Sequence, residues 1–320
     1  MFKFILSLFI ALTFAFGVSA QPKFWKNVWK NTDFSKTSID FNSVLDGGPG
    51  KDGIPAILDP VMDVIANADG LSDREPVISI NIDGELGRAY PIRYLMWHEI
   101  VNDRVGNVPI AITFCPLCNS GVVFDRRLDG QILTMGVSGM LRNSDMIMYD
   151  HQTESWWQQF TGEAIVGELL NKKLTKLPSR MESWGNFKER NPDGLVQREP
   201  QVNRPYGQNP YAGYDTGRPF LYNGENPPNG INPMARVVVV GDRAWPLQRI
   251  SKAQVLNEEG LTFSWTKGTS SALDTREISK GRDIGAIRVT DKAGKDVVHD
   301  VAFAFAFHAF NPNGKWMLGN

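Results

Sequence analysis

The sequence predicts a mostly β (α+β) protein, a strand-rich barrel or sandwich with short helices, built from two divergent internal repeats. Three observations support this fold class. Short stretches in which apolar and polar residues alternate recur along the chain, separated by turns rich in Gly, Asp and Asn. Stretches with helical spacing are brief. One succession of strand, glycine turn, short helix and strand occurs in each half.

The first twenty residues have the pattern of a secretory signal peptide. Lys3 supplies the positive start, residues 5–16 form a short apolar run, and small residues at 18–20 provide a cleavage site. We therefore expect residues 1–20 to be removed and residues 21–320 to form one mature domain. The protein is then expected to be exported, to the periplasm or the extracellular space, with no membrane span after cleavage.

The composition argues against a nucleic-acid partner. Lys and Arg number 34 and Asp and Glu 35, so the formal net charge is −1. A chain with this balance lacks the basic surface that phosphate backbones require. The hydrophobic share of 42%, which includes 9 Trp and 18 Phe, is enough for a full core.

Four strands stand out in chain order. Isoleucines alternate with polar residues at 78–82, just before an Asp-Gly turn. A second strand is expected at 110–114 and a third at 121–124. Near the C-terminus, phenylalanines alternate with alanines over 301–307, which predicts a strand with one aromatic face and one small face.

Helices are expected at three places. Pro60 follows an Asp that can cap a helix running through residue 68. Pro91 can start a second helix, because apolar residues follow it at helical spacing as far as residue 100. Ser183 can cap a third helix over 184–190, which the Asn-Pro-Asp-Gly stretch that follows would end.

The internal repeat is seen when residues 77–103 are set beside residues 236–260. Both contain a strand, a glycine turn, an Ala-aromatic-Pro-aliphatic stretch and a short helix. The repeat-like halves are 74–175 and 235–311, and only the first contains cysteines. A connection at 198–234, rich in Gly, Pro, Asn and Tyr, lies between them. Its aromatic residues suggest that it packs onto the body, either as a functional lid or recognition loop or as a passive ordered coil.

The only two cysteines lie three positions apart, in the stretch Thr-Phe-Cys-Pro-Leu-Cys-Asn-Ser-Gly at 113–121. In an exported protein a structural disulfide usually joins distant segments, because a longer closed loop removes more entropy from the unfolded chain. Cys115 and Cys118 would close almost no loop. The pair therefore indicates a reactive or metal-binding site, in a tight connection between two strands.

From residue 33 to residue 311 the sequence resembles a family of exported prokaryotic proteins, domain-of-unknown-function family 3179. The family's activity is unassigned. Some members are described as selenoproteins with selenocysteine at the cysteine motif, so the resemblance implies thiol or selenol redox chemistry there. Asn119 stands where many relatives have Gly, and we expect it to change turn geometry only. The matching stretches are 47–57, 74–103, 109–126, 136–159 and 233–247.

Thiol–disulfide redox chemistry is the first hypothesis for the motif. Two cysteines this close can be oxidised and reduced with little backbone motion. Strands flank the motif, so no helix N-terminus stabilises a thiolate, and the stabilising group is expected among His98, Arg126 and Arg142. The site residues are then Cys115, Cys118, His98 and Arg126, acting on an unknown redox partner or small-molecule substrate. Whether the protein is an enzyme is left open by these patterns.

Metal binding is the alternative, with Cys115, Cys118 and His98 as ligands of one copper or zinc ion. A closed zinc site needs four ligands, whereas copper(I) accepts two or three soft ones. In a third interpretation the cysteines are inert core residues, and His98 could equally be a core histidine bonded to a carbonyl. Arg126 could hold a carboxylate or an anionic substrate group. Candidate acids and bases are Glu99, Glu154 and Glu163.

Overall fold

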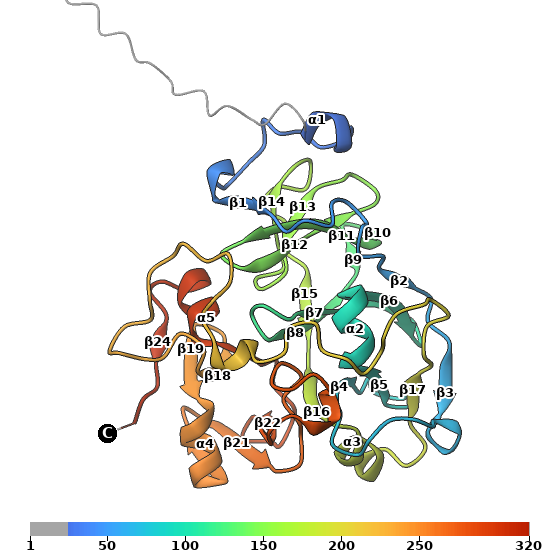
Figure 1. Cartoon of the computed structure of the whole chain (residues 1–320), viewed down its shortest axis with the longest axis vertical. Coiled ribbons are helices and arrows are strands. Elements are labelled where there is room, and N and C mark those ends of the chain that lie inside the picture. Colours follow the sequence, from blue (N-terminus) through green and yellow to red (C-terminus); the bar gives the residue numbers. More distant parts are fainter. Residues whose placement is uncertain (1–24, 320) are drawn as a thin grey trace, which may run out of the picture.

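The computed structural model describes residues 25–319, so the predicted signal peptide lies outside the described part. Strands hold 37% of the residues and helices 15%, which confirms the mostly β class. Five small sheets form a propeller-like ring (Figure 1), in place of the expected barrel or sandwich. In the described part of the chain, no sheet has more than five strands, and no strand ladder runs on from one main sheet to the next. Within residues 25–319, no helix has the length and apolar character needed to cross a membrane.

The sheet that carries the cysteines has five strands. Its central hairpin is formed by β7 and β8, which pair antiparallel from Ile110 opposite Asp125 to Cys115 opposite Ser120. Most residues of both strands are buried, so this sheet forms part of the main core. Its order is β15 (Thr175–Leu177), β8 (Ser120–Asp125), β7 (Val108–Cys115), β6 (Ile100–Val105) and β2 (Ile57–Leu58).

A second sheet lies across the end of this hairpin (Figure 1). Its two longest strands, β11 and β12, form a hairpin with Arg142 opposite Asp145 at the tip. One face of the sheet packs on an N-terminal aromatic cluster around Trp25, Trp29 and Phe34, whose rings contact Trp156 of the sheet. The strand order is β1 (Val44–Asp46), β11 (Met135–Arg142), β12 (Asp145–Asp150), β13 (Trp156–Gln158) and β14 (Glu163–Val166).

Two further sheets share one arrangement. In each, an antiparallel pair is extended by a parallel strand that follows a short helix and an Asn-Pro stop. The first contains β16 (Ser179–Ser183), β4 (Pro76–Ile80), β5 (Arg88–Pro91), β17 (Leu195–Gln197) and β3 (Met62–Val64). The second contains β23 (Asp300–Phe303), β18 (Arg236–Val240), β19 (Arg243–Pro246) and β24 (Lys315–Trp316).

A three-stranded sheet completes the ring, and a two-stranded ribbon lies outside it. The element order after β4 and after β18 is the same, namely strand, helix, strand and strand, but common descent of the two halves stays a prediction. The remaining strands are β20 (Val255–Glu258), β21 (Leu261–Thr266), β22 (Ala286–Thr290), β9 (Arg127–Leu128) and β10 (Gln131–Ile132).

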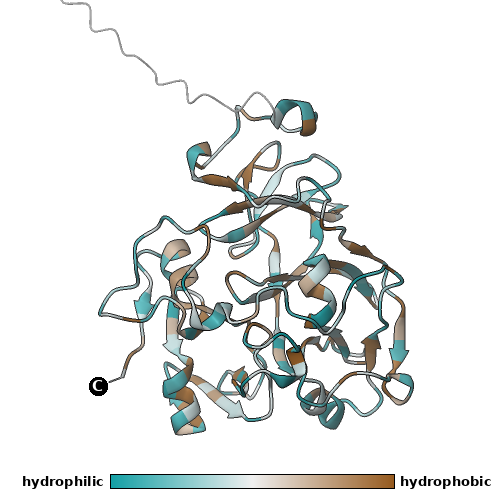
Figure 2. Ribbon diagram, in the orientation of Figure 1, coloured by the Kyte–Doolittle hydropathy of each residue, from teal (hydrophilic) through white to brown (hydrophobic). Residues whose placement is uncertain are grey.

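The helices are short and lie at the edges of sheets. Helix α4 is largely hydrophilic (Figure 2), and Ile250 is its one buried residue. The α-helices are α1 (Trp25–Val28), α2 (Ile92–His98), α3 (Trp184–Arg190), α4 (Leu247–Ala253) and α5 (Ala304–Phe310). The 3-10 turns are η1 (Phe41–Ser43), η2 (Ile65–Asn67), η3 (Tyr214–Thr216) and η4 (Ile278–Lys280).

Two sequence predictions about these elements are wrong. The strand expected over 301–307 ends at Phe303, and α5 follows. Alanine is the strongest helix former. Residues 304–307 are all buried, so both the alanines and the phenylalanines of α5 face the interior, and their alternation does not indicate a strand with two different faces. The helix expected over 60–68 is instead strand β3 followed by η2, because β17 offers an edge that β3 can pair with.

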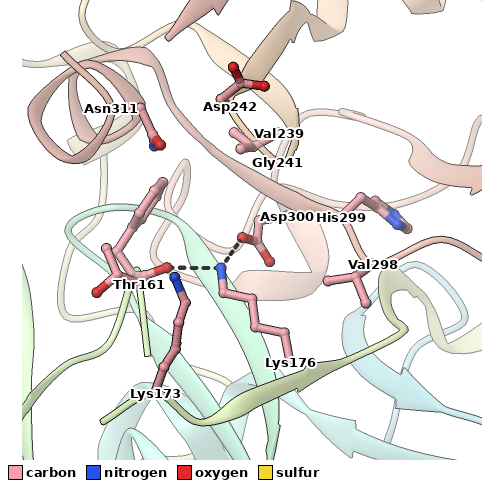
Figure 3. Close-up of a pocket in the computed structure, with 11 residues that line it drawn as sticks. Thr161, Lys173, Lys176, Val239, Gly241, Asp242, Val298, His299, Asp300 and Asn311 are labelled. Atoms are coloured by element: carbon pink, nitrogen blue, oxygen red, sulfur yellow. Dashed lines mark hydrogen bonds and ion pairs between the residues drawn. The ribbon is translucent and has the colours of Figure 1, made fainter. Parts of the chain in front are cut away.

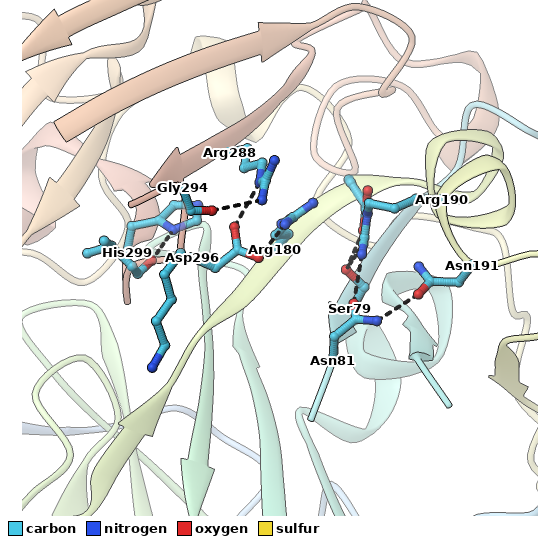
Figure 4. A network of polar contacts seen from close by, with 12 residues as sticks. Ser79, Asn81, Arg180, Arg190, Asn191, Arg288, Gly294, Asp296 and His299 are labelled. Carbon is cyan, nitrogen blue, oxygen red and sulfur yellow. Dashed lines mark hydrogen bonds and ion pairs between the residues drawn. The ribbon is translucent and has the colours of Figure 1, made fainter. Parts of the chain in front are cut away.

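A polar network joins the third and fifth sheets (Figure 4). Arg180 of β16 and Arg288 of β22 both bind the carboxylate of Asp296, at 2.5 and 2.9 Å. On the other side of β16, Arg190 reaches the hydroxyl of Ser79 at 3.3 Å. These contacts join β16 and β22, which belong to different sheets and share no strand ladder.

Candidate functional site

The cysteine motif occupies a tight connection between β7 and β8, as the sequence predicted. Asn119 has φ 52°, a left-handed conformation that Gly and Asn tolerate best. Its N–H donates to the carbonyl of Pro116 at 3.2 Å. The side-chain amide also donates to the carbonyl of Val301 in β23 at 3.1 Å. Asn119 therefore does more than shape the turn, because it also fastens the motif to the neighbouring sheet.

Both cysteines are free thiols in the interior. Cys115 is 1% exposed and Cys118 is fully buried. Their sulfur atoms lie 4.1 Å apart, and both donate to the carbonyl oxygen of Ser144, at 3.7 and 3.5 Å. Ser144 and Asn143 both have positive φ, as the two central residues of a tight hairpin turn require. The tip of the β11–β12 hairpin thus presents a carbonyl to both thiols.

The next residue of that hairpin, Asp145, brings a carboxylate to the thiols. One oxygen atom of Asp145 and the two sulfur atoms all lie within 4.8 Å of one another. Oδ2 accepts hydrogen bonds from Gln158 Nε2 at 2.7 Å and from the N–H of Phe160 at 2.9 Å. Oδ1 has no hydrogen-bond partner among the described residues. Burial raises the pKa of Asp145 to about 6, against the hydrogen bonds that lower it.

Burial also controls the ionisation of the two thiols. It raises the pKa of Cys115 and raises that of Cys118 well above its usual value, and in Cys118 the contact with Cys115 raises it further. Both sulfurs are therefore protonated in the resting protein at neutral pH. A reactive thiolate would form here only with the help of a base or of a metal ion.

Several buried polar atoms beside the motif lack partners. Gln159 donates through Nε2 to Thr113 Oγ1 at 2.9 Å and to the carbonyl of Ser120 at 3.3 Å, so its side chain lies on the β7–β8 ladder. Inert core cysteines would have apolar surroundings, whereas unsatisfied polar atoms in the interior point to a site that holds or acts on something. The unpartnered atoms here are Arg142 Nε, Asp145 Oδ1, Ser120 Oγ and Gln159 Oε1.

The structure does not bring His98 or Arg126 into this cluster. His98 is buried, with Nδ1 bonded to the carbonyl of Pro55 at 2.7 Å and Nε2 to the hydroxyl of Tyr206 at 2.6 Å. Burial lowers its pKa. It does not belong to the metal-capable group of described residues, which contains the two cysteines and Asp145.

Arg126 binds main-chain oxygens and no carboxylate of residues 25–319. Its three nitrogens donate to the carbonyls of Ile110, Leu133 and Asp103 at 3.0, 2.7 and 3.1 Å. Ile110 lies near the start of β7, whereas Cys115 ends that strand. Arg126 thus ties β6, β7 and the loop before β11 together, at the end of the sheet remote from the thiols.

The connection 198–234 covers the motif. The hydroxyl of Tyr214 donates to the carbonyl of Leu117 at 3.0 Å and accepts from the N–H of Phe220 at 3.2 Å. Ser144 donates through its hydroxyl to the carbonyl of Phe220. Together with Tyr211 and Tyr222, Tyr214 packs on the main core, which confirms that the connection lies on the body. Tyr214 and Phe220 of this segment thus contact both the cysteine turn and the Ser144 turn.

A cavity of about 490 Å³ lies beside the site (Figure 3). Phe160 lines it, and the N–H of the same residue bonds to Asp145. The ammonium group of Lys176 in this cavity is already held by Asp300 at 2.6 Å and by the carbonyl of Phe160 at 2.9 Å. Lys176 and Asp300 are thus used in an internal contact, and the thiol cluster remains the candidate functional site.

Asp145 is the residue that the sequence interpretation missed. The Arg-Asn-Ser-Asp stretch at 142–145, between two runs of alternating apolar residues, was a signal for the hairpin turn. It carried no signal that the turn meets the cysteine motif, because β11 and β12 belong to another sheet than β7 and β8.

Comparison with known proteins gives a family and no activity. A family model described as "Protein of unknown function (DUF3179)" matches residues 51–314, which is most of the chain. No curated protein matches the chain. No solved structure matches it either.

Proposed function

Because this chain belongs to the DUF3179 family of proteins of unknown function, we propose its function from the site alone: reversible thiol–disulfide chemistry at Cys115 and Cys118. Asp145 serves as the proton acceptor. The observation that carries the proposal is the unpartnered Oδ1 atom of Asp145, in a cluster with two free thiols. A carboxyl with a pKa of about 6 is mostly ionised at neutral pH, so it can take a proton from a neighbouring thiol.

The reaction balances with a low-molecular-weight disulfide as the oxidant. One cysteine gives its proton to Asp145 and attacks a sulfur of the oxidant, which forms a mixed disulfide and releases a thiolate. The other cysteine then displaces the second thiolate and closes the Cys115–Cys118 bond. The two protons pass to the two released thiolates. Closure needs the sulfurs to move from 4.1 Å to about 2 Å, which side-chain rotation in the turn can supply.

The substrate is a small molecule in this proposal, and the protein is exported. Neither thiol is more than 1% exposed, so a folded protein partner has no surface to attack. A small disulfide can enter once the covering connection at 198–234 moves aside. The signal-peptide pattern of residues 1–20 supports an oxidising compartment outside the cytoplasm.

Equilibration of the native protein in thiol–disulfide buffers, followed by intact mass measurement, tests the proposal. We expect a reversible loss of two hydrogens with one midpoint. Cys115→Ser and Cys118→Ser should abolish this mass change and keep the fold, because a serine hydroxyl can donate to the Ser144 carbonyl as the thiol does. A native protein whose mass stays constant over the whole range of buffers would refute the proposal.

A soft-metal centre is the second candidate, favoured by the distance between the sulfurs. Two sulfur ligands at about 2.3 Å from one ion fit a separation of 4.1 Å, which is far longer than a disulfide. Asp145 takes the place of His98 as the third ligand, so the set is Cys115, Cys118 and Asp145 for one copper or zinc ion. Copper(I) is satisfied by the two soft thiolates alone, whereas zinc would need a fourth ligand besides the two cysteines and Asp145.

The native mass of protein purified without chelator or reductant separates the two candidates. Redox chemistry predicts the mass of the dithiol or the disulfide. A metal centre predicts a mass above that of the protein alone by the mass of one ion. This excess mass should be lost in Cys115→Ser, Cys118→Ser and Asp145→Asn, but kept in His98→Gln. An excess that survives all three substitutions of the cluster would place the ion elsewhere.

A further inference from the structure

Arg142 has a guanidinium group without an acid partner. It ends β11 and lies opposite Asp145 in the hairpin that meets the cysteine turn. The residue is partly buried, and no carboxylate of residues 25–319 forms an ion pair with it. Its Nη1 donates to Gln158 Oε1 at 3.2 Å, whereas its Nε is buried without a partner. A charge that is removed from water is normally paired, so Arg142 is free to pair with an anion from outside the chain.

Two fully buried arginines show what such a group otherwise binds. Arg236 forms an ion pair with Asp215 at 2.9 Å, and Arg126 donates from all three of its nitrogens to main-chain carbonyls. Within the described chain, Nη1 is the one nitrogen of Arg142 that has a partner. Nε and Nη2 remain, and these two donors form the side of the planar fork that fits a carboxylate.

A short chain of contacts joins Arg142 to the thiols. Gln158 is 1% exposed and lies between the two charged groups of the hairpin. Its Oε1 accepts from Arg142, and its Nε2 donates to Asp145 Oδ2 at 2.7 Å. An oxygen of Asp145 lies within 4.8 Å of the sulfur atoms of Cys115 and Cys118. Arg142 is thus separated by a single side chain from the carboxylate that neighbours the thiols.

Aromatic rings connect Arg142 to the cavity beside the site. The guanidinium lies over the ring of Phe310, at 5.8 Å from its centre. Phe310 stacks on Phe160 with 5.1 Å between the ring centres, and Phe160 lines the cavity of about 490 Å³ (Figure 3). A cation bordered by apolar rings fits a ligand that has an apolar body and one anionic group.

We propose that Arg142 is the specificity residue of the thiol site and binds a carboxylate of the small disulfide substrate. This inference rests on the proposed redox function and narrows its substrate to disulfides that carry a carboxylate. The carboxylate accepts hydrogen bonds from Nε and Nη2 once the connection at 198–234 has moved aside. It leaves with its half of the substrate, so it takes no part in the transfer of electrons.

Two related probes test the proposal. Dithiodipyridine is a small aromatic disulfide without charge at neutral pH, and dithiodinicotinate is the same molecule with a carboxylate on each ring. The rate of thiol oxidation by each probe is divided by its rate with the urea-unfolded protein, which cancels the intrinsic reactivity of the probe. We expect the wild type to prefer dithiodinicotinate by about tenfold or more, and Arg142→Gln to lose this preference. A wild type without preference would overturn the proposal.

Two further variants separate a local contact from the overall charge. Arg142→Lys keeps the charge but lacks the planar fork, so its preference should fall between those of the wild type and Arg142→Gln. Lys173→Gln removes a positive charge from the cavity wall, where Lys173 pairs with Glu163 at 2.7 Å, and it should keep the preference. If Lys173→Gln loses as much preference as Arg142→Gln, the probe senses the overall charge and the assignment to Arg142 is wrong.

Binding without reaction distinguishes a failure of this inference from a failure of the redox function. The double variant Cys115→Ser/Cys118→Ser cannot form a disulfide. Calorimetric titration of this variant with dithiodinicotinate should show saturable binding, which the added Arg142→Gln exchange weakens by about tenfold or more. If that is found but the wild type forms no reversible disulfide, the redox function fails and the carboxylate site stands. If the wild type cycles normally and the double variant binds no dithiodinicotinate, only the carboxylate site fails.

Discussion

Asp145→Asn is expected to stabilise the protein at neutral pH while suppressing the chemistry of its thiols. The folded-state pKa of Asp145 is raised from 3.8 to about 6, so the carboxyl binds its proton more tightly in the folded state than in the unfolded state. Its contribution to stability is therefore fully present below the unfolded pKa and is lost as the pH rises toward the folded one. That loss is about 3 kcal/mol by the time the pH reaches neutrality.

An amide at this position avoids the loss. Its oxygen can accept the two hydrogen bonds that Asp145 Oδ2 now accepts, and its NH₂ group can donate to a sulfur or a carbonyl. Denaturant unfolding near pH 8 should show Asp145→Asn to be more stable than the wild type by up to about 3 kcal/mol, and near pH 4 the difference should disappear. Thiol oxidation by a small disulfide should slow by about a hundredfold, because the proton acceptor is gone.

Asp150→Asn is the matched control, at the other end of the same strand. Asp150 is fully buried like Asp145, but both of its oxygens accept hydrogen bonds from Thr153, and Oδ2 also accepts from the indole of Trp157 at 2.9 Å. The same exchange there should destabilise the protein by about 1 to 3 kcal/mol and leave the thiols as reactive as before. Equal effects of the two substitutions would show that Asp145 has no special relation to the thiols.

Local sequence signals predicted local structure well. Ser183 caps α3 by accepting from the N–H of Asn186 at 3.1 Å, and the helix spans Trp184–Arg190 as expected. The expected helix after Pro91 begins at Ile92, although it ends at His98. The cysteine turn lies between two strands, as its flanks indicated. Each of these features is determined by residues within a few positions of one another, so the local sequence pattern is enough to predict it.

The composition of the site could not be predicted in the same way. Asp145 reaches Cys115 because the tip of one hairpin from the second sheet lies on the end of another from the first. His98 was expected near the thiols because α2 precedes the cysteine strand, but Pro55 and Tyr206 hold its ring. The positions of Asp145 and of His98 both depend on how separate sheets pack on one another. The periodicity of apolar residues in the sequence does not predict that packing.

Asp215→Asn is expected to loosen the segment that covers the thiols. Asp215 lies in η3, directly after the tyrosine that bonds to the cysteine turn. Its carboxylate accepts hydrogen bonds from Arg236 at 2.9 Å and from the hydroxyl of Ser271, and it binds Arg282 at 2.7 Å. Arg236 and Asp215 are both buried, so neutralising the acid leaves a buried guanidinium without its counter-charge. Such a loss typically costs about 3 to 5 kcal/mol.

Much of that cost can be relieved by local opening, because the connection 198–234 has little regular structure beyond η3. Under native conditions we expect Asp215→Asn to react with dithiodipyridine at least about tenfold faster than the wild type, which corresponds to about 1.4 kcal/mol in the opening equilibrium. Hydrogen exchange should speed up in residues 205–222 and stay unchanged in β7 and β8. Asp274→Asn is the control, since Asp274 also binds Arg282, at 3.0 Å, but does not touch Arg236.

Acidification should act on the wild type in the same direction. Burial opposes ionisation of Asp215, but the hydrogen bond from Ser271 and the charge of Arg236 hold its pKa below the usual value. Stability from this group is therefore present above the pKa of an unfolded aspartate and is lost as the pH falls through the lower folded value. In strong acid, hydrogen exchange in residues 205–222 of the wild type should then rise toward the rate of Asp215→Asn. Asp215→Asn itself should show no such acid-induced increase. If Asp215→Asn keeps its thiols as protected as the wild type does, the carboxylate does not hold the cover closed, and access to Cys115 and Cys118 must open elsewhere in the ring.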